Sequence, residues 1–457
     1  MEKFDLAIVG AGPGGYVAAI RAAKEGKKVA IIEGRDLGGT CLNRGCIPSK
    51  TMLKHAEVLN QIKEADKYGI QVSSFYYSLE QMVSRKNKVI NQLKSGIQRL
   101  LKQSKITFYQ GYGFVKEDKS ITVKSEQEES KLSAEYIILA NGSKPFVPEL
   151  PGLGDIDYCT SDTIFDIKEL PEHLVIVGGG VIGLEIACIF NSMGTKIEII
   201  EMADRILPTE DQDASAFLAK QLKKSGVKIH TETQISSFAK EDGGTKVELK
   251  HKGKVQSTTT QHVLMCVGRI PNITGIEALS LEMNGKFVKT DSNLQTSVNG
   301  IYAIGDLIGG YQLAHAASNE GIKAVDHLVG NPVVDATVPR CVYTFPEISS
   351  IGLSEAKAIE MGYDVKTKKV DLAGNGKAIA AGENTGFMKL IAEKKYGEVI
   401  GVVMVGTHVT EMISQATSFI HLEGTVEEVD SMIFPHPTIS EGLSEAAASW
   451  LGKGIHY

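Results

Sequence analysis

The chain has 457 residues, enough for three or four domains, and its 42% hydrophobic and 23% charged residues are ordinary for a globular protein. Its 49 basic and 55 acidic side chains give a net charge of −6, which disfavours a nucleic acid partner because a phosphate backbone would be repelled. No apolar run approaches the roughly 18 residues of a membrane-spanning helix, and the start shows no signal-peptide pattern. We therefore expect a cytoplasmic protein without a membrane partner.

The first forty residues are typical of a strand, a glycine-rich turn, a helix and a second strand. An apolar run at residues 5–9 leads to glycines in the G-x-G-x-x-G spacing, and a second run at 29–32 leads to an acid. The first glycine allows a tight turn, the second lets backbone approach a pyrophosphate, and the third lets helix and strand pack closely. The acid accepts hydrogen bonds from ribose hydroxyls. The residues that define this dinucleotide site are Gly10, Gly12, Gly15 and Glu33.

Two of the six cysteines, Cys41 and Cys46, are separated by only four residues. A chance pair of buried thiols or half of a zinc site would also give this spacing, but no second Cys/His cluster offers further zinc ligands, so we expect no metal. The functional alternative is a redox-active disulfide on the first turn of a helix, with Pro48 in an early helical position. Lys50 would then share a face with Cys46, either stabilising a thiolate or remaining a solvated surface lysine.

The glycine pattern returns 168 positions later, between apolar runs at 174–177 and 197–200. The repeated residues are Gly178, Gly180, Gly183 and Glu201. Two complete copies predict two dinucleotides. Glu201 would bond a free ribose 2′-hydroxyl and repel a 2′-phosphate, which favours NAD over NADP. Arg205, four residues further on, weakens that preference.

The rest of the chain changes pattern twice. Short alternating runs over 226–267 predict strands that close the second unit, and an apolar strand over 300–304 leads to Asp306. From about residue 338 we expect a separate C-terminal domain. Its expected strands lie in 338–353 and 386–405, and its expected helices in 411–421 and 440–450.

Near the C-terminus, two prolines flank a single histidine, His436. Thr438 and Glu441 match a capping box, so a surface turn before a helix is one explanation. The other is that His436 acts as a general base, because its ordinary pKa of about 6.5 suits removal of a proton from a thiol. Glu441 would then orient the ring.

The segment 38–50, the two glycine-rich units and the His–Glu pair resemble the pyridine nucleotide–disulfide oxidoreductases over essentially the whole chain. The resemblance implies an α/β fold with two Rossmann-like dinucleotide-binding domains, for FAD and NAD, and a C-terminal α+β dimerisation domain. The implied divisions are 1–147 for the first part of the FAD domain, 148–268 for the NAD domain, 269–337 for the central region completing the FAD domain, and 338–457 for the dimerisation domain.

The resemblance also implies roles for individual residues. Cys41 is the interchange thiol that attacks the substrate, and Cys46 is the thiol against the flavin. Lys50 lies near the flavin and pairs with Glu185, and Asp306 contacts the ribityl chain. The other implied FAD contacts are Gly113, Asn141, Gly142, Ser143, Gln312, Leu313, Ala314 and His315.

The implied nicotinamide-side contacts are Ile235 and Gly268. Two positions depart from the family pattern: Arg44 stands where valine is frequent, and Asn141 stands where threonine is frequent. Neither touches the redox atoms in this interpretation, so both bear on tuning more than on function.

The implied activity is NAD⁺-dependent oxidation of a dihydrolipoyl dithiol on a lipoyl-bearing protein of a 2-oxo acid dehydrogenase or glycine cleavage complex. The implied assembly is a homodimer in which His436 and Glu441 enter the partner's active site. Alternatives are a glutathione- or mercuric-reductase-like enzyme, disfavoured by Glu201 and by a tail without cysteine, and a soluble transhydrogenase or NADH oxidase. A non-catalytic nucleotide-binding scaffold would be expected to have lost a redox residue.

Overall fold

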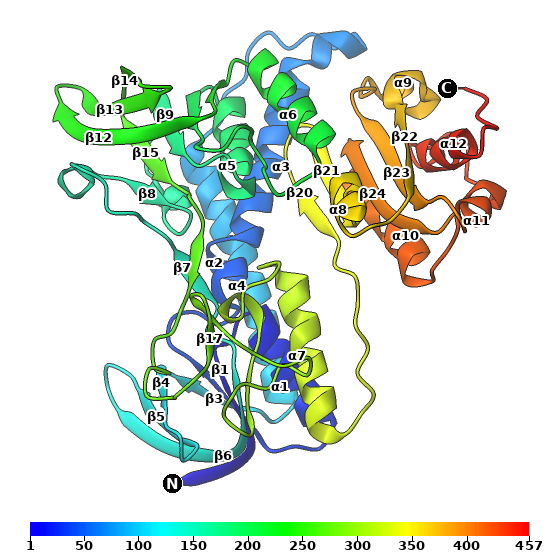
Figure 1. The fold of residues 1–457 in the computed structure, drawn as a ribbon. Helices are drawn as coiled ribbons and strands as arrows, with labels where there is room; N and C mark the ends of the chain where they lie inside the picture. Colours follow the sequence, from blue (N-terminus) through cyan, green and yellow to red (C-terminus); the bar gives the residue numbers. More distant parts are fainter. Residues whose placement is uncertain (457) are drawn as a thin grey trace.

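The computed structural model describes residues 1–456, and its first layer is a seven-stranded sheet (Figure 1). The strand order is β3-β2-β1-β6-β5-β4, with β19 paired to β6. The inner strands run parallel and are apolar on both faces, whereas β4 and β5 turn back antiparallel. Its strands are β1 (Glu2–Val9), β2 (Val29–Glu33), β3 (Thr107–Gln110), β4 (Tyr112–Val115), β5 (Ser120–Lys124), β6 (Glu129–Leu139) and β19 (Ile301–Ala303).

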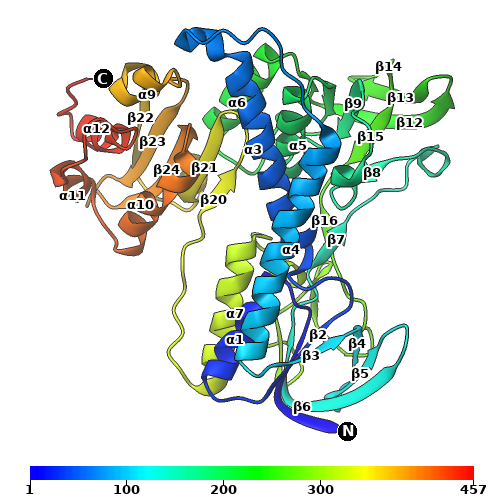
Figure 2. The same ribbon diagram turned by 180° about the vertical axis from the view of Figure 1, so that it is seen from behind.

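Helices distant in sequence cover this sheet. The helices α1 and α7 approach closely because both carry glycine at the contact: a Cβ on Gly321 would lie 2.6 Å from the Gly14 carbonyl oxygen. The long helices α3 and α4 pack against each other (Figure 2), and Ser78 caps α4 by accepting from the Gln81 N–H. The helices here are α1 (Pro13–Lys24), α2 (Gly39–Asn43), α3 (Cys46–Lys63), α4 (Leu79–Gln103) and α7 (Ala314–Val329).

The second layer is a five-stranded parallel sheet of order β11-β10-β9-β15-β8, covered on one face by a three-stranded antiparallel sheet. The helix α5 is almost wholly buried because it also packs against α3. The elements are β8 (Cys159–Thr160), β9 (His173–Val177), α5 (Val181–Ser192), β10 (Lys196–Ile200), α6 (Gln212–Lys224), β11 (Lys228–His230), β12 (Thr233–Glu241), β13 (Gly244–His251), β14 (Lys254–Thr260) and β15 (His262–Met265).

The buried carboxylate of Glu198 connects the five-stranded sheet with the three-stranded sheet that covers it. It lies 2.7 Å from His230 Nε2 and 3.4 Å from His173 Nε2, and it accepts a hydrogen bond from the Thr258 hydroxyl at 3.0 Å. Burial alone would raise the pKa of Glu198, but the hydrogen bonds outweigh it and the net pKa lies below the usual range. The hydrogen bond between His173 and Glu198 raises the pKa of His173.

Replacing Glu198 by glutamine should lower the free energy of unfolding near neutral pH by about 1–3 kcal/mol, because its half-buried histidine and threonine partners lose a charged acceptor. The lowered carboxyl pKa means that the contribution of Glu198 is present above its unfolded pKa of about 4.3 and is lost as pH falls through the folded pKa. The free energy of unfolding, measured in urea, should therefore fall less between about pH 6 and about pH 3 for Glu198→Gln than for the wild type. An equal fall in unfolding free energy for both proteins would contradict this. The control is Glu241→Gln, at an exposed position of β12.

The third layer is an antiparallel sheet of order β20-β21-β24-β23-β22 with helices on both faces. Its buried Lys389 bonds Asp211 at 2.9 Å, and Arg340 bonds Glu210 at 3.1 Å, so paired charges link it to the second unit. The elements are β20 (Arg340–Val342), β21 (Glu347–Gly352), α8 (Glu355–Glu360), β22 (Val365–Asp371), α9 (Gly376–Ala381), β23 (Phe387–Glu393), β24 (Val399–Gly406), α10 (Val409–His421), α11 (Val426–Ser431) and α12 (Glu441–Trp450).

The remaining strands form short ribbons, β7 (Ser143–Pro145) with β16 (Arg269–Pro271), and β17 (Met283–Asn284) with β18 (Phe287–Val288). The pair β7–β16 lies where the chain leaves the first unit and where it returns (Figure 2). Within residues 1–456, no helix is both long and apolar enough to cross a membrane. The predicted α/β fold with two parallel-sheet units and a C-terminal α+β region is confirmed.

Candidate redox and dinucleotide-binding site

The glycines of the first turn divide into two that packing requires and one that opens onto space. A Cβ on Gly10 would lie 2.2 Å from the Ala140 carbonyl oxygen, and one on Gly15 would lie 1.9 Å from the Gly10 carbonyl oxygen. A Cβ on Gly12 would meet only the Gly39 Cα, at 3.8 Å. The middle glycine therefore leaves room for a pyrophosphate to approach the backbone.

The second turn repeats this arrangement. A Cβ on Gly178 would lie 2.5 Å from the Cys266 carbonyl oxygen, and one on Gly183 would lie 2.4 Å from the Gly178 carbonyl oxygen. A Cβ on Gly180 would meet nothing within 4 Å. Both helices that follow, α1 and α5, have the middle glycine as their N-cap residue and no side-chain cap, so the N–H groups of their first turn are free to bind phosphate.

Glu33 braces the first turn while remaining an acceptor for a ribose. Its carboxylate accepts from the Ala11 N–H at 2.8 Å and from the Arg35 N–H at 2.7 Å, one bond to each oxygen. Each carboxylate oxygen can accept more than one hydrogen bond. The geometry fits the predicted contact between Glu33 and a ribose hydroxyl.

Glu201 has the same two partners 168 positions later. It accepts from the Gly179 N–H at 2.6 Å and from the Ala203 N–H at 2.7 Å. The guanidinium of Arg205 donates from Nη2 to the Pro208 carbonyl at 2.9 Å. Among the described residues, the ion pair of Arg205 is with Asp204 and not with Glu201, so the Glu201 carboxylate keeps its charge for a ribose hydroxyl.

Two buried polar atoms mark the space beside the first unit. Asn141 Oδ1 and Gln312 Nε2 are buried and have no hydrogen-bond partner among the described residues. Buried polar groups nearly always have a partner, so these atoms fit a site that a polar ligand completes. Both are predicted FAD contacts, and the residues present therefore fit that cofactor.

The structure brings Ser143 to Asp306, as a shared contact with one ligand requires. The Ser143 hydroxyl donates to the Asp306 carboxylate and accepts from Arg269 Nε at 2.7 Å. Glu320 was not predicted, yet its carboxylate accepts from the Gly305 N–H at 2.6 Å and fixes the turn before Asp306. Burial raises the pKa of Glu320. Its position on α7 carries no motif of its own.

The remaining predicted FAD contacts are Gly113, Gly142, Leu313, Ala314 and His315. Gly142 has a φ of +69°, and a Cβ there would meet nothing within 4 Å. Leu313 and Ala314 form the start of α7, which has no side-chain cap. The ring of His315 bonds the Pro339 carbonyl at 2.8 Å, so one ring nitrogen is already engaged.

The predicted nicotinamide-side residues lie beside the linker into the second unit. Ile235 packs on an apolar cluster with Val147 and Leu150, and the Gly268 carbonyl accepts from the Phe146 N–H at 3.0 Å. Gly268 has a φ of +115°, which favours glycine.

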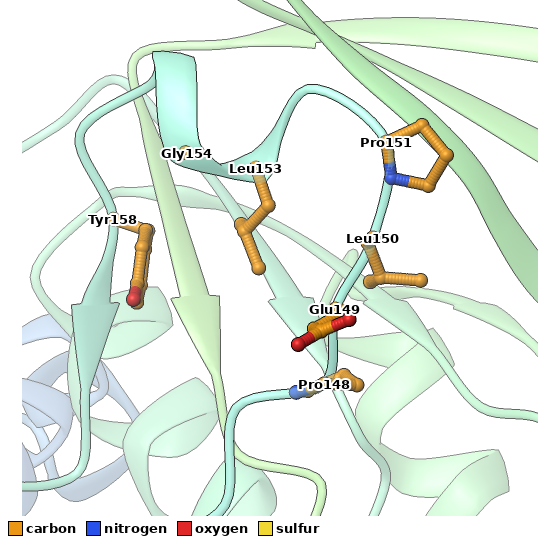
Figure 3. Close-up of a pocket in the computed structure, with 7 residues that line it drawn as sticks. All are labelled: Pro148, Glu149, Leu150, Pro151, Leu153, Gly154 and Tyr158. Atoms are coloured by element: carbon orange, nitrogen blue, oxygen red, sulfur yellow. The ribbon is translucent and has the colours of Figure 1, made fainter.

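A hollow of about 460 Å³ opens on this linker (Figure 3). It is lined by Pro148, Glu149, Leu150, Pro151, Leu153, Gly154 and Tyr158. None of the predicted catalytic or cofactor-binding residues lines it. The hollow therefore does not mark the redox centre.

Cys41 and Cys46 form a disulfide, with Cα atoms 4.7 Å apart. Cys46 is the first residue of α3, at the helix start that the sequence predicts, whereas Cys41 lies in the preceding short helix α2. The 18-residue helix has no side-chain cap, so its free N–H groups and dipole stabilise a thiolate on Cys46. The other cysteines are free, and burial raises the pKa of Cys188 to about 12.

Lys50, one turn after Cys46 on α3, forms an ion pair with Glu185. Lys50 Nζ lies 2.9 Å from both carboxylate oxygens of Glu185. Glu185 is buried and also accepts from the Ser49 hydroxyl at 2.7 Å and from the Tyr343 N–H at 3.2 Å. Ser49 and Tyr343 were not predicted. Ser49 adjoins Lys50 in the motif, whereas no sequence signal connects Tyr343 with a residue 158 positions away.

Arg44 links the loop between the two cysteines to acids outside it. Its Nη1 donates to Asp36 at 2.7 Å, and its Nε lies 3.7 Å from Asp162. Arg269 lies 3.7 Å from the other oxygen of Asp162. The departure from the family pattern is thus accommodated by paired carboxylates.

The His436 ring bonds Glu441 at 2.9 Å, and the ring is 80% exposed. Burial would raise the pKa of Glu441, but hydrogen bonds from the Thr438 N–H and from His436 lower it overall, so the carboxylate stays ionised. The predicted capping box is only half right: Thr438 donates its N–H to Glu441, but its hydroxyl bonds the Pro435 carbonyl and the helix starts at Glu441.

The His436–Pro437 bond is cis. Among the described residues, the recorded hydrogen bonds connect the His436 ring only to Glu441 and none to the disulfide of the same chain. The base predicted by the resemblance therefore faces solvent in its own subunit.

Comparison with known proteins agrees with this site. Family models described as pyridine nucleotide-disulphide oxidoreductase and as its dimerisation domain match residues 4–321 and 338–447. A dihydrolipoyl dehydrogenase of Bacillus subtilis (strain 168) is 40% identical, covering 100% of this chain and 99% of the relative. The structure of LpdA from Mycobacterium tuberculosis is 26% identical with a TM-score of 0.89, covering 98% of this chain and 99% of that one.

A Cu(II) complex of the HOCl-induced flavoprotein disulfide reductase RclA from Escherichia coli is 27% identical with a TM-score of 0.88, covering 98% of this chain and 100% of that one. The resemblance seen in the sequence is thereby confirmed, and with it the cofactor pair of FAD and NAD. The chain belongs to the pyridine nucleotide-disulphide oxidoreductases and carries their dimerisation domain.

Proposed function

We propose that the chain catalyses the reaction named in its relatives, the oxidation of a protein-bound dihydrolipoyl dithiol to the cyclic disulfide with reduction of NAD⁺ to NADH. The observation that carries the proposal is the Cys41–Cys46 disulfide at the start of α3, with the Lys50–Glu185 ion pair one helical turn further along. The two glycine-rich turns at residues 10–15 and 178–183, called the dinucleotide cradles below, provide separate sites for two dinucleotides. The disulfide can accept two electrons from a dithiol, and the second cradle can hold the nicotinamide nucleotide that receives them.

In the proposed reaction, His436 of the partner subunit accepts a proton from one substrate thiol. The resulting thiolate attacks Cys41 Sγ, the bond between Cys41 and Cys46 breaks, and Cys46 leaves as a thiolate stabilised by the α3 N-terminus. The second substrate thiol then attacks the substrate sulfur of the mixed disulfide and passes its proton to the departing Cys41 sulfur. This step releases the lipoyl disulfide and leaves Cys41 as a thiol and Cys46 as a thiolate. FAD, when bound, supplies the two-electron path from this dithiol to NAD⁺.

The protein's other residues bind and orient in this proposal. The first cradle and the residues around Asn141, Asp306 and Gln312 hold FAD, and the second cradle with Glu201 holds NAD⁺. Residues 1–147 and 269–337 form the FAD domain, 148–268 the NAD domain, and 338–457 the dimer surface.

We further propose a homodimer that acts in the cytoplasm on the lipoyl group of a 2-oxo acid dehydrogenase or glycine cleavage complex. The dimerisation domain and the solvent-facing His436 support the dimer, since a base that faces away from its own disulfide can serve a neighbour's. The free cysteines support a reducing compartment.

The proposal predicts selective turnover when NAD⁺ and NADP⁺ are each offered dihydrolipoamide or reduced glutathione. Dihydrolipoamide with NAD⁺ should turn over at least about tenfold faster than any other combination. A tenfold preference over NADP⁺ corresponds to about 1.4 kcal/mol, which repulsion between the Glu201 carboxylate and a 2′-phosphate would supply. The measurement is the initial rate of NADH formation at matched concentrations. Rapid turnover with glutathione, or a clear preference for NADP⁺, would overturn the assignment.

A further inference from the structure

The buried carboxylate of Glu185 accepts hydrogen bonds from two other parts of the chain. Lys50 and Ser49 come from α3, Glu185 itself from α5, and the Tyr343 N–H from the segment after β20 in the third layer. The Glu185 side chain is 7% exposed, whereas the Lys50 side chain is 35% exposed. The carboxylate is thus fixed by several bonds, while the lysine has a route to solvent.

The Tyr343 ring covers the cation of that pair. Lys50 Nζ lies 4.1 Å from the ring centroid, within the range where an aromatic face attracts an ammonium ion. Burial raises the pKa of Tyr343, so the phenol remains neutral at working pH. The ring and the carboxylate therefore hold the ammonium group from two sides.

We propose that Tyr343 is a positioning residue for the redox centre: its N–H and its ring hold the Lys50–Glu185 pair in place, so that the dimerisation domain fixes the orientation of Lys50. The inference deepens the proposed function and rests on it, since it concerns the cation on α3 one turn after Cys46. A lysine carries a long flexible stem, and its orientation depends on such contacts.

The consequence concerns Lys50 more than Glu185. Without the ring, Glu185 keeps its bonds to Ser49 and to the residue 343 N–H, but the ammonium group loses one of the two surfaces that confine it. Lys50 should then spend more time in solvent. Electron transfer through the site should slow, whereas binding of the dithiol at Cys41 should change little.

The test compares Tyr343→Leu, which removes the aromatic face, with Tyr343→Phe, which keeps it. Phe345→Leu is the matched control, because Phe345 packs on the same apolar cluster. The first readout is the acylation rate of Lys50 in the purified protein, measured by mass spectrometry, which needs no turnover. The second is the split between kcat and KM for dihydrolipoamide, with the visible flavin spectrum recorded alongside.

We expect Lys50 in Tyr343→Leu to be acylated roughly three- to tenfold faster than in the wild type, with a similar fall in kcat and little change in KM. Tyr343→Phe should match the wild type. If the leucine variant does not fold, Tyr343→Met takes its place.

Unchanged labelling in the leucine and methionine variants would overturn the inference, as would an equal rise in Tyr343→Phe or Phe345→Leu. Failure of the proposed function would show instead as absent dihydrolipoamide turnover in the wild type. The labelling of Lys50 does not depend on that turnover, so the two failures are distinguishable.

Discussion

Replacement of Cys46 by serine should lower dihydrolipoamide-dependent NAD⁺ reduction by roughly a thousandfold or more while FAD stays bound. Serine cannot form a disulfide, so the two-electron relay between substrate and cofactor is lost. The cradles that hold the dinucleotides contain neither cysteine, and their geometry should survive. The measurements are steady-state kcat and the flavin content per subunit.

The matched control is Cys159→Ser, because Cys159 is a free cysteine on β8, within the second unit. It should retain wild-type turnover. Substantial turnover by Cys46→Ser would contradict the relay. A wild-type protein without flavin colour would do the same, as would one without long-wavelength absorbance after mild reduction.

The second large effect is expected from His436→Gln, which removes the proposed base. General bases contribute about 10²–10⁴-fold, so kcat should fall by that factor. Glutamine keeps a polar side chain in the same loop, so the fold should be unaffected. His421→Gln on α10 is the control, since it changes another histidine of the same layer without touching Glu441.

Mixing two inactive chains tests where His436 acts. If the base serves the partner's disulfide, a heterodimer of Cys46→Ser and His436→Gln chains contains one complete site. Co-expression at equal levels should then restore about one quarter of wild-type activity, because half the dimers are mixed and each has one working site. No recovery in verified heterodimers would place the base in its own subunit and contradict the proposal.

Features carried by contiguous residues were predictable from the sequence. The twin glycine turns were identified correctly because each glycine answers a local need that the structure shows as a Cβ clash or an open space. The helix start at Cys46 was identifiable for a similar reason, since Pro48 suits an early helical turn.

Contacts between distant residues were not predictable. Nothing near Tyr343 indicates that its N–H bonds a carboxylate 158 positions earlier, and the bond from Gly305 to Glu320 depends on how α7 is placed. The pairing of Lys50 with Glu185 came from family resemblance, not from local physics.

The capping box at Thr438 shows the opposite limit. Its spacing was correct, but a competing bond to Pro435 took the hydroxyl. The sequence does not predict the edge strand β22, because most of its residues are lysine, threonine or aspartate and its burial does not alternate.

The apolar cluster around α5 has a consequence for modularity. It includes Met52 and Leu59 of α3, Phe190 of α5 and Phe387 of β23, so it belongs to all three layers at once. Expressing residues 148–268 alone would expose to solvent the apolar face of α5 that the other layers cover. The chain should therefore resist recombination at its apparent domain borders and melt as a single cooperative body.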